Sequence, residues 1–457
     1  MNRSRWRGPL ALFAVAMLLM SSCSSRGDDS SDDGGDGGDG GNGDVESSID
    51  IDDCETDPTA EIEGDTIKLV SSYPQSELVG AFAEIARGWA AYFDKVNEEG
   101  GVEIAGKSYQ IEFEDKDDVY NPQQTASNIE ELVGADGSNA FAVFSVVGTA
   151  NNINVRDFLG ELCVPNLFAA TGSVAWGNPD YPWLLGSTLA PYTLEAQAFA
   201  DYLKENQPEA KVAMLVQNDE FGATYEQGFR QAIEGTDIEV VAVEEYPSGA
   251  DEVSTQVASL AASDADAFFN GATLLACPDA LTSKQDEGWE PTTWVSATCI
   301  SKTLMILAGA AGDGALSFTN LKDPLNPAYA DDPAMVAFKE TVEQYRTDFK
   351  GRALDLENAI ILYGYVQAEI FVQALEAAEA PTRLAVMESV HNIDGFTSDL
   401  AIDGVSFTTS GGDDPFLGES LRLVQYDAAA GHFSEIGELQ DWEGETLSLT
   451  PEDLVNA

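Results

Sequence analysis

Two short loops in the middle of the chain combine small residues with hydroxyl groups, a composition that suits holding a polar ligand. Residues 148–151 have the sequence Gly-Thr-Ala-Asn and follow the apolar run 140–147. Residues 169–173 have the sequence Ala-Ala-Thr-Gly-Ser and follow a second short strand predicted at residues 164–168. Small side chains let a ligand approach the backbone, and N–H groups at the start of a helix attract a carboxylate or another polar oxygen.

The two loops are expected at the same edge of one sheet. The apolar runs before them are typical of strands buried on both faces, and a helical pattern of apolar residues separates them. In an open parallel sheet adjacent strands end side by side, and ligands bind beyond their carboxyl ends. In the alternative interpretation, Gly148 and Gly172 only form tight turns and the small residues allow helices to pack on the sheet. Two such loops after successive strands favour a binding site.

The sequence lacks the motifs of several enzyme classes. It has two histidines, His391 and His432, and no cysteine–histidine cluster with the spacing of zinc ligands. Serine nucleophile elbows, phosphate-binding glycine-rich loops with lysine and dinucleotide fingerprints are absent as well. A secreted hydrolase with paired carboxylates is an alternative, but among 80 acidic residues such pairs arise by chance. We therefore expect no catalysis, no metal and no cofactor.

The chain is strongly acidic. Its 22 basic and 80 acidic residues give a formal net charge of −58 at pH 7. Such a surface repels nucleic acids and anionic lipid headgroups, which excludes DNA and RNA as partners and leaves the N-terminal lipid as the one expected contact with a membrane. The charge suits a solvated surface that keeps the protein soluble, and it equally suits a salty habitat in which ions screen the self-repulsion.

The first 22 residues predict a signal peptide for export. Three arginines precede an apolar stretch, residues 9–20, that is short for a membrane span. The sequence Leu-Met-Ser-Ser-Cys at residues 19–23 then resembles the lipobox of bacterial lipoproteins, in which Cys23 takes a lipid and becomes the new N-terminus. An ordinary secretory signal with an incidental cysteine is the alternative.

Residues 23–64 are expected to form a disordered, lipid-anchored linker. The part before residue 51 is mostly Ser, Gly and Asp, and it has too little apolar surface to offset its ordering entropy. As a random coil the linker spans roughly 35 Å, which holds a folded body off a membrane. At the other end of the chain, residues 446–457 are expected to form a C-terminal tail.

Four further cysteines, Cys54, Cys163, Cys277 and Cys299, predict two disulfides, because an even number of cysteines in an exported chain favours pairing. Three pairings are possible. We favour Cys277–Cys299, which flank one helix–strand unit, and Cys54–Cys163, which would fix the end of the linker to the first folded part. Buried free thiols are the alternative.

The remainder of the chain alternates predicted strands and helices. Strand-like runs at 66–70, 109–113 and 211–217 precede amphipathic helical patterns, and the same rhythm repeats after about residue 190. This alternation predicts an α/β fold with parallel sheets flanked by helices. A chain of 457 residues is long enough for two lobes, each with its own core.

Several short motifs, in their order and spacing, carry a family resemblance. Besides Gly-Thr at 148–149 and Val-Pro-Asn-Leu-Phe-Ala-Ala-Thr-Gly at 164–172, they are YFDKVNEEGGV at 92–102, QNDEFG at 217–222, LKDP at 321–324 and ADDP at 330–333. The series resembles the solute-binding proteins of ABC importers for branched-chain amino acids and amides, the Leu/Ile/Val-binding-protein-like family, over about residues 65–438. The resemblance implies the type I periplasmic-binding-protein fold, with two Rossmann-like lobes joined by a multi-strand hinge.

The resemblance also implies how the chain divides between the lobes. Residues 65–188 and 316–402 are expected to form the first lobe, and residues 189–315 and 403–445 the second. The chain would then cross between the lobes three times.

By the same resemblance, loops of both lobes line a cleft and hold the ligand. Tyr73 would form an aromatic wall, although it is equally explained as an aromatic residue in a turn. Phe221 would close over the ligand, with a core position as the alternative. The expected ligand-binding residues are Tyr73, Thr149, Ala150, Ala169, Ala170, Thr171, Phe221, Thr273 and Thr298.

The family resemblance implies a partner as well as a ligand. Branched-chain amino acid binders place an acidic residue near positions 297–299 to pair with the ligand's ammonium. This chain has none there, unless Asp219 or Glu220 supplies the charge, so a small carboxylate or an amide suits the site as well as an amino acid.

Taken with the export signal and the family resemblance, we expect a monomeric, extracytoplasmic lipoprotein that closes its lobes on a small polar metabolite (an amino acid, an amide or a small carboxylate). It would deliver this metabolite to an ABC permease. A sensor ectodomain that reports the ligand to a membrane receptor is the alternative.

Overall fold

The computed structural model describes residues 49–76, 79–411 and 414–446. The expected signal peptide, the expected lipidation site Cys23 and residues 447–457 of the expected tail lie outside the described residues. Within the described ranges, no helix is long and apolar enough to cross a membrane.

A six-stranded sheet forms the core of the first lobe. Its strands are β1 (Thr66–Tyr73), β2 (Val102–Ile104), β3 (Lys107–Asp117), β4 (Ala142–Phe144), β5 (Asn166–Ala169) and β6 (Leu184–Gly186). They lie in the order β2-β3-β1-β4-β5-β6. The strands from β3 to β6 are parallel, and β2 forms an antiparallel hairpin with β3.

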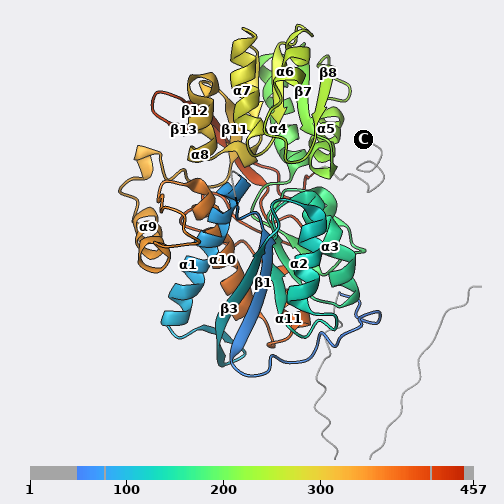
Figure 1. Ribbon diagram of the computed structural model, residues 1–457, viewed down its shortest axis with the longest axis vertical. Coiled ribbons are helices and arrows are strands. Elements are labelled where there is room, and N and C mark those ends of the chain that lie inside the picture. The colour runs from blue at the N-terminus through green and yellow to red at the C-terminus, as the bar shows by residue number, and fades with distance from the viewer. Residues whose placement is uncertain (1–48, 77–78, 412–413, 447–457) are drawn as a thin grey trace, which may run out of the picture. The chain divides into compact units, whose positions relative to one another are not determined.

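Helices cover both faces of this first sheet. Figure 1 shows α1 (Ala83–Glu98) and α10 (Ala359–Ala377) on one side of β1 and β3, and α2 (Pro122–Val133) and α3 (Thr149–Glu161) on the other. Because successive side chains of a strand point to opposite faces, Leu69 packs in the cluster with α1 and α10, whereas Val70 packs in the cluster with α2 and α3. Helices α9 (Pro333–Arg346) and α11 (Arg383–Val390) also pack on the first lobe.

A seven-stranded sheet forms the core of the second lobe. Its strands are β7 (Lys211–Gln217), β8 (Glu239–Tyr246), β9 (Ala267–Gly271), β10 (Thr292–Val295), β11 (Leu316–Thr319), β12 (Ser420–Asp427) and β13 (His432–Asp441). They lie in the order β13-β12-β11-β10-β9-β7-β8. The strands from β8 to β11 are parallel, and β12 and β13 continue the sheet in antiparallel pairs.

Two hydrophobic clusters lie on the two faces of the second sheet. Val212 and Met214 of β7 pack with α4 (Tyr192–Asn206) and α5 (Glu220–Ala232). Ala213 and Leu215, which alternate with them, pack with the other three helices, α6 (Ser254–Ala261), α7 (Ala276–Asp286) and α8 (Lys302–Ala308). The two-lobed α/β fold expected from the sequence is therefore confirmed.

The chain crosses between the lobes in three adjacent segments. Asn320 Nδ2 in the second crossing donates to the Thr188 carbonyl oxygen in the first, at 2.8 Å. A Cβ atom on Gly418, in the third crossing, would lie 2.7 Å from the same oxygen, so only glycine allows this close approach. The three crossings form the hinge.

The structure corrects the expected lobe boundaries. Strand β11 pairs with β10, so the chain leaves the second lobe near residue 320 and not at residue 316. Residues 403–419 were expected in the second lobe, but Val405, Phe407 and Leu417 belong to the hydrophobic cluster of the first lobe. The place of both segments depends on contacts that are distant in the sequence, which periodicity does not reveal.

Residues 49–64 are packed against the first lobe, which corrects the expectation of a disordered linker through residue 64. Ile49 is buried in the first lobe's hydrophobic cluster. The Ile62 N–H donates to the Pro381 carbonyl oxygen at 2.9 Å. Cys54 forms a disulfide with Cys163, the pair favoured from the sequence.

Candidate functional site

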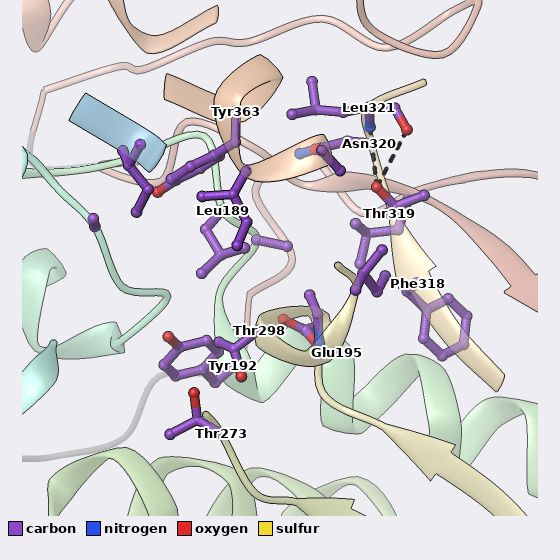
Figure 2. A pocket seen from close by; sticks show the side chains of 18 of the residues that line it. Leu189, Tyr192, Glu195, Thr273, Thr298, Phe318, Thr319, Asn320, Leu321 and Tyr363 are labelled. Atoms are coloured by element: carbon purple, nitrogen blue, oxygen red, sulfur yellow. Dashed lines mark hydrogen bonds between the residues drawn. The ribbon is translucent and has the colours of Figure 1, made fainter. Parts of the chain in front are cut away.

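A cavity of about 130 Å³ lies between residues of the two lobes. The first lobe contributes side chains that follow β3, β4 and β5, together with the start of α10. The second lobe contributes the first turn of α4 and the loops after β7, β9 and β10, and the hinge contributes residues 318–322. These segments lie at the carboxyl ends of parallel strands, where ligands bind in open α/β sheets. Figure 2 shows the cavity with residues of both lobes around it.

Five of the nine residues expected to bind ligand line this cavity. They are Thr149 and Ala170 of the first lobe, and Phe221, Thr273 and Thr298 of the second. Tyr73, Ala150, Ala169 and Thr171 are not in the lining.

Tyr73 lies in the core of the first lobe and not at the ligand. Strand β1 extends to residue 73, so the alternation of its side chains places Tyr73 on the same sheet face as Leu69. Its hydroxyl donates to Asp115 Oδ2 at 2.6 Å, and its ring packs edge-on against Trp89. The expectation of an aromatic wall at Tyr73 was wrong. Ala169, the last residue of β5, is buried in the same way, in a cluster with Trp176.

The first-lobe half of the cavity is built on a pair of threonines. Gly148 precedes α3 with a φ of 104°, a conformation that favours glycine. Thr149 Oγ1 then lies 2.6 Å from Thr171 Oγ1, which connects the two loops. The Ala170 N–H donates to the Val146 carbonyl oxygen at 2.8 Å and is not available to a ligand, so the second loop offers less backbone than expected. The first turn of α3, at Thr149, leaves N–H groups without a helical acceptor.

Tyr120 lines the cavity and was not expected there. It follows β3, and both Val119 and Tyr120 have positive φ angles, of 47° and 59°. Such angles are uncommon for residues other than glycine and need support from the surrounding structure. Asp118 provides it: its buried carboxylate accepts from the Tyr120 N–H at 2.9 Å and from Thr125 Oγ1 at 2.9 Å. Burial raises the pKa of Asp118 to about 6.

Glu195, in the first turn of α4, is one of three acidic residues that line the cavity, together with Asp323 and Glu435. Its side chain has 0% exposure, and Oε2 accepts from the Ala297 N–H at 3.0 Å. Oε1 is buried and has no hydrogen-bond partner among the described residues. Burial raises the pKa of Glu195 to about 8, although the Ala297 N–H and the nearby Tyr225 hydroxyl lower it in part.

Glu195 corrects the expectation that no acid lies near positions 297–299. The carboxylate comes from a helix about 100 residues earlier in the chain, and Figure 2 shows it beside Thr298. The loop acids considered as substitutes do not line the cavity. Asp219 instead caps α5, where it accepts from the N–H groups of Phe221 and Gly222 at 3.1 and 3.3 Å. Burial raises the pKa of Asp219 to about 6.

Phe221 lies both in the lining of the cavity and in the core of the second lobe, the alternative position given for it. It lines the cavity, and its ring also packs edge-on against Tyr192 and Tyr225, at centroid distances of 5.0 and 5.3 Å. The core of the second lobe therefore fixes the wall that Phe221 presents to the cavity.

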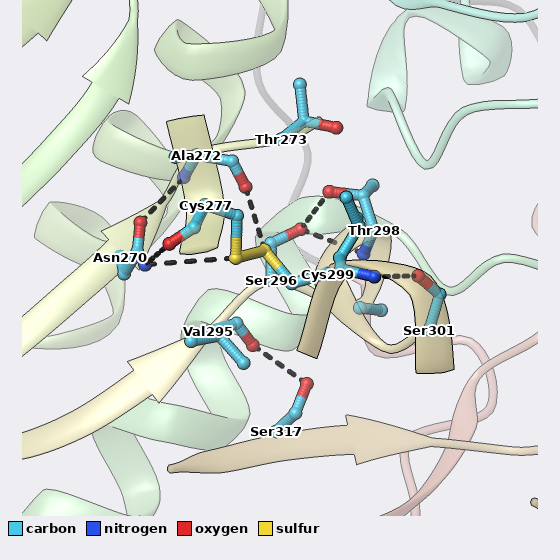
Figure 3. Close-up of a disulfide and its surroundings, with 12 residues drawn as sticks. Asn270, Ala272, Thr273, Cys277, Val295, Ser296, Thr298, Cys299, Ser301 and Ser317 are labelled. Carbon is cyan, nitrogen blue, oxygen red and sulfur yellow. Dashed lines mark hydrogen bonds between the residues drawn. A yellow bond between two sulfur atoms is a disulfide. The ribbon is translucent and has the colours of Figure 1, made fainter. Parts of the chain in front are cut away.

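The second disulfide fixes the loop that binds Glu195. Cys277 of α7 is bonded to Cys299, the other pair favoured from the sequence. Cys299 ends the short helical turn η3 (Ala297–Cys299), and Figure 3 shows Thr298 and Thr273 around this bond. Ser296 Oγ also accepts from the Thr298 N–H at 3.1 Å. The Ala297 N–H is thus held in place on the side of Glu195.

One ion-pair group connects the lobes at the edge of the site. Lys302 Nζ of α8 lies 3.1 Å from Asp355 Oδ2 and 2.7 Å from Glu357 Oε2, both in the first lobe before α10. These groups are partly exposed, so solvent weakens their attraction.

Away from the cavity, Asp414, Glu419 and Glu443 bring carboxylate oxygens within 4.8 Å of one another. The Glu419 carboxylate already accepts from the Gly444 N–H at 2.7 Å and from the Thr446 N–H at 3.2 Å. We assign no metal to this cluster.

Comparisons with known proteins agree on one family of binding proteins. A family model described as periplasmic binding protein matches residues 66–431. The Leu/Ile/Val-binding protein homolog 3 of Brucella melitensis is 25% identical over 346 residues, which cover 74% of this chain and 86% of that protein.

Two solved structures are similar in fold. A branched-chain amino acid ABC transporter protein from Thermus thermophilus with bound valine has a TM-score of 0.70 at 19% identity, covering 83% of this chain and 97% of that one. A fatty acid ABC transporter substrate-binding protein from Thermomonospora curvata has a TM-score of 0.69 at 19% identity, covering 84% and 95%. The two neighbours are named for ligands of different polarity, so the fold alone does not specify the ligand.

Proposed function

This chain belongs to the periplasmic binding protein family, and we propose that it is an extracytoplasmic lipoprotein that captures a small polar metabolite and delivers it to the permease of an ABC importer. Amino acids, amides and small carboxylates are the candidate ligands. The observation that carries the proposal is the cavity between the carboxyl ends of two parallel sheets, to which both lobes and the hinge contribute.

The lining of the cavity suits a ligand with an apolar body and polar ends. Apolar side chains from both lobes, such as Ile85, Leu189 and Ile360, form much of the wall. Thr149 and Glu195 place polar atoms at fixed positions within it. A mostly apolar pocket with a few placed polar groups is typical of small-molecule binding sites.

The cavity lining supports binding without turnover. Among the residues that the structure describes, the lining includes neither histidine, a common general base, nor cysteine, a thiol nucleophile. The hydroxyl of the lining residue Thr149 is hydrogen-bonded to the Thr171 hydroxyl and not to a base that could activate it as a nucleophile.

Closure of the lobes would couple binding to delivery. The three crossings allow the lobes to move as units, and a ligand that contacts both lobes favours the closed form over the open one. The ion pairs of Lys302 with Asp355 and Glu357 form across the same gap and add to closure. The closed molecule, anchored as a monomer through Cys23, would then present the surface that the permease recognises.

Native mass spectrometry of the freshly purified full chain tests this proposal. We expect a co-purifying small molecule, released on denaturation and not chemically altered after prolonged incubation. Adding it back at about 100 times its dissociation constant should stabilise the ligand-free protein by about 2.7 kcal/mol. Turnover of the molecule by the pure protein would contradict the proposal, as would the failure of any solute in a broad metabolite panel to raise the melting temperature.

A further inference from the structure

We propose that Leu274 and Tyr120 form a latch between the lobes, which keeps part of the ligand-free population closed. Each of the two residues extends from its own lobe into the other. This role rests on the proposed function and goes beyond it, because a contact between the lobes acts on closure whichever solute binds.

Leu274 belongs to the second lobe in the chain but packs into the first. It follows β9, and its neighbours Ala272 and Ala276 belong to a hydrophobic cluster of the second lobe. Leu274 itself is 4% exposed and belongs to the hydrophobic cluster of the first lobe. Opening of the lobes separates its side chain from that cluster and exposes it to water, so its burial favours the closed form.

The loop that carries Leu274 is held in an unusual conformation. The φ angle of Leu274 is 53°, which is uncommon for residues other than glycine. The Thr273 N–H donates to the Tyr246 hydroxyl at 3.0 Å, and the Cys277 N–H donates to the Leu274 carbonyl oxygen at 3.3 Å. Backbone of this kind persists only where the surrounding structure fixes it, and it is found most often in binding and switching regions.

Tyr120 makes the reciprocal contact. It follows β3 of the first lobe and packs against the cluster of that lobe, with a φ of 59°. Its hydroxyl faces the second lobe, where it makes a side-chain hydrogen bond with Gln217 at the end of β7. Asp219 fixes Gln217 in turn, because Asp219 Oδ2 accepts from Gln217 Nε2 at 2.5 Å. Tyr246, which holds the Leu274 loop, also lies near the Tyr120 hydroxyl, so the two contacts of the latch are neighbours.

The latch changes the affinity for a solute without requiring that Leu274 touch it. Leu274 is not among the described residues that line the cavity. A contact made only in the closed form raises the closed population, and the apparent affinity for every solute rises with that population. Burial of one leucine side chain favours the closed form by about tenfold to a hundredfold. We therefore expect L274A to lower the ratio of closed to open molecules by at least about fivefold.

A distance measurement by electron paramagnetic resonance on the full chain tests the latch, after bound solute has been removed. Spin labels on non-natural amino acids replace Leu307 of α8 in the second lobe and Val336 of α9 in the first, both of which are exposed. We expect the wild type to show a closed and an open population, and L274A and Y120F each to shift molecules to the open one. L274M conserves the side-chain volume and should keep the wild-type distribution.

L260A is the matched control, because Leu260 has 0% exposure and lies within the second lobe's own hydrophobic cluster. The same substitution there loosens one lobe without removing a contact between the two, so L260A should keep the wild-type distances. The latch is refuted if either L274A or Y120F keeps the wild-type distribution, or if L260A opens the protein as far as L274A does.

Titration with L-leucine, leucinamide and isocaproate provides a second readout. Each probe that binds the wild type should bind L274A more weakly, by one common factor of about three or more. Factors that differ from probe to probe would overturn the latch, because they would show that Leu274 contacts the solute. The distances are measured without solute, so they decide the role of the latch even if the metabolite panel refutes the proposed function.

Discussion

Replacing Glu195 with glutamine should stabilise the ligand-free protein at alkaline pH while it weakens ligand binding. Glutamine has nearly the same shape and can still accept from the Ala297 N–H, which donates to Glu195 Oε2 at 3.0 Å. Glutamine does not ionise, so at high pH the folded variant does not have to bury a negative charge. The variant therefore separates the role of Glu195 in binding from its effect on folding.

The magnitude of this stabilisation follows from the pKa of Glu195. Burial raises this pKa from 4.5 to about 8 in the folded protein. The folded state thus keeps a proton that the unfolded state releases, and stability falls as pH rises from about 4.5 to about 8. Each unit of difference in pKa between the folded and unfolded states corresponds to about 1.4 kcal/mol. The rise from 4.5 to about 8 therefore lowers the free energy of unfolding above pH 8 by at most about 5 kcal/mol. Relaxation and water entry reduce such penalties, so we expect about 2–4 kcal/mol at about pH 8.5.

Urea unfolding of wild type, E195Q and E205Q at about pH 5 and about pH 8.5 measures the difference, after bound solute has been removed. E205Q is the matched control, because Glu205 lies on the same helix and is exposed. E195Q should match wild type within about 1 kcal/mol at the lower pH and exceed it at the higher pH, whereas E205Q should follow wild type at both. An equal effect of E195Q at both pH values would refute the reasoning, because it would show that the folded protein already compensates the charge.

Three further changes test other parts of the site. G172A would place a Cβ atom 2.2 Å from the Ala190 carbonyl oxygen at the first crossing, and we expect about 1–3 kcal/mol lower stability in urea unfolding together with weaker binding. Replacing Cys277 and Cys299 together with serine should lower stability by about 3 kcal/mol and weaken ligand binding, because the loop that holds the Ala297 N–H loses its anchor. Unchanged ligand titrations would contradict this role. K302M removes the ion pairs between the lobes. Because salt screens such pairs, we expect ligand affinity to fall by less than about fivefold at low salt and to stay unchanged near 1 M salt. A loss of affinity that does not depend on salt would show another role for Lys302.

The sequence predicted the fold well because its signals are local. The predicted runs 66–70, 109–113 and 211–217 lie within β1, β3 and β7, and the last of them coincides with β7. Short segments were less certain. The apolar run 140–147 contains only three strand residues, Ala142–Phe144, and the strand at 316–319 was assigned to the wrong lobe. Such short runs are placed by their partners in the sheet, which periodicity does not reveal.

The cavity was predicted in part, and the misses have a common physical cause. The family resemblance, which places the ligand at loops after strands, gave Thr149, Thr273 and Thr298, and all three line the cavity. Glu195 was missed because its approach to the Ala297 N–H depends on how α4 packs beside the end of β10. Tyr120 was missed because no sequence motif marks its positive φ, which accompanies a local hydrogen bond from its N–H to Asp118, two residues earlier.

The packing of residues 49–64 has a mechanical consequence. The disulfide Cys54–Cys163 and the buried Ile49 join the N-terminal chain to the first lobe. If Cys23 carries a lipid as we propose, any pull from the membrane enters the molecule at this lobe and bypasses the hinge. The first lobe then bears the tension in the N-terminal linker, and the second lobe bears none. We therefore expect the second lobe to open and close at the same rate whether the linker is relaxed or extended.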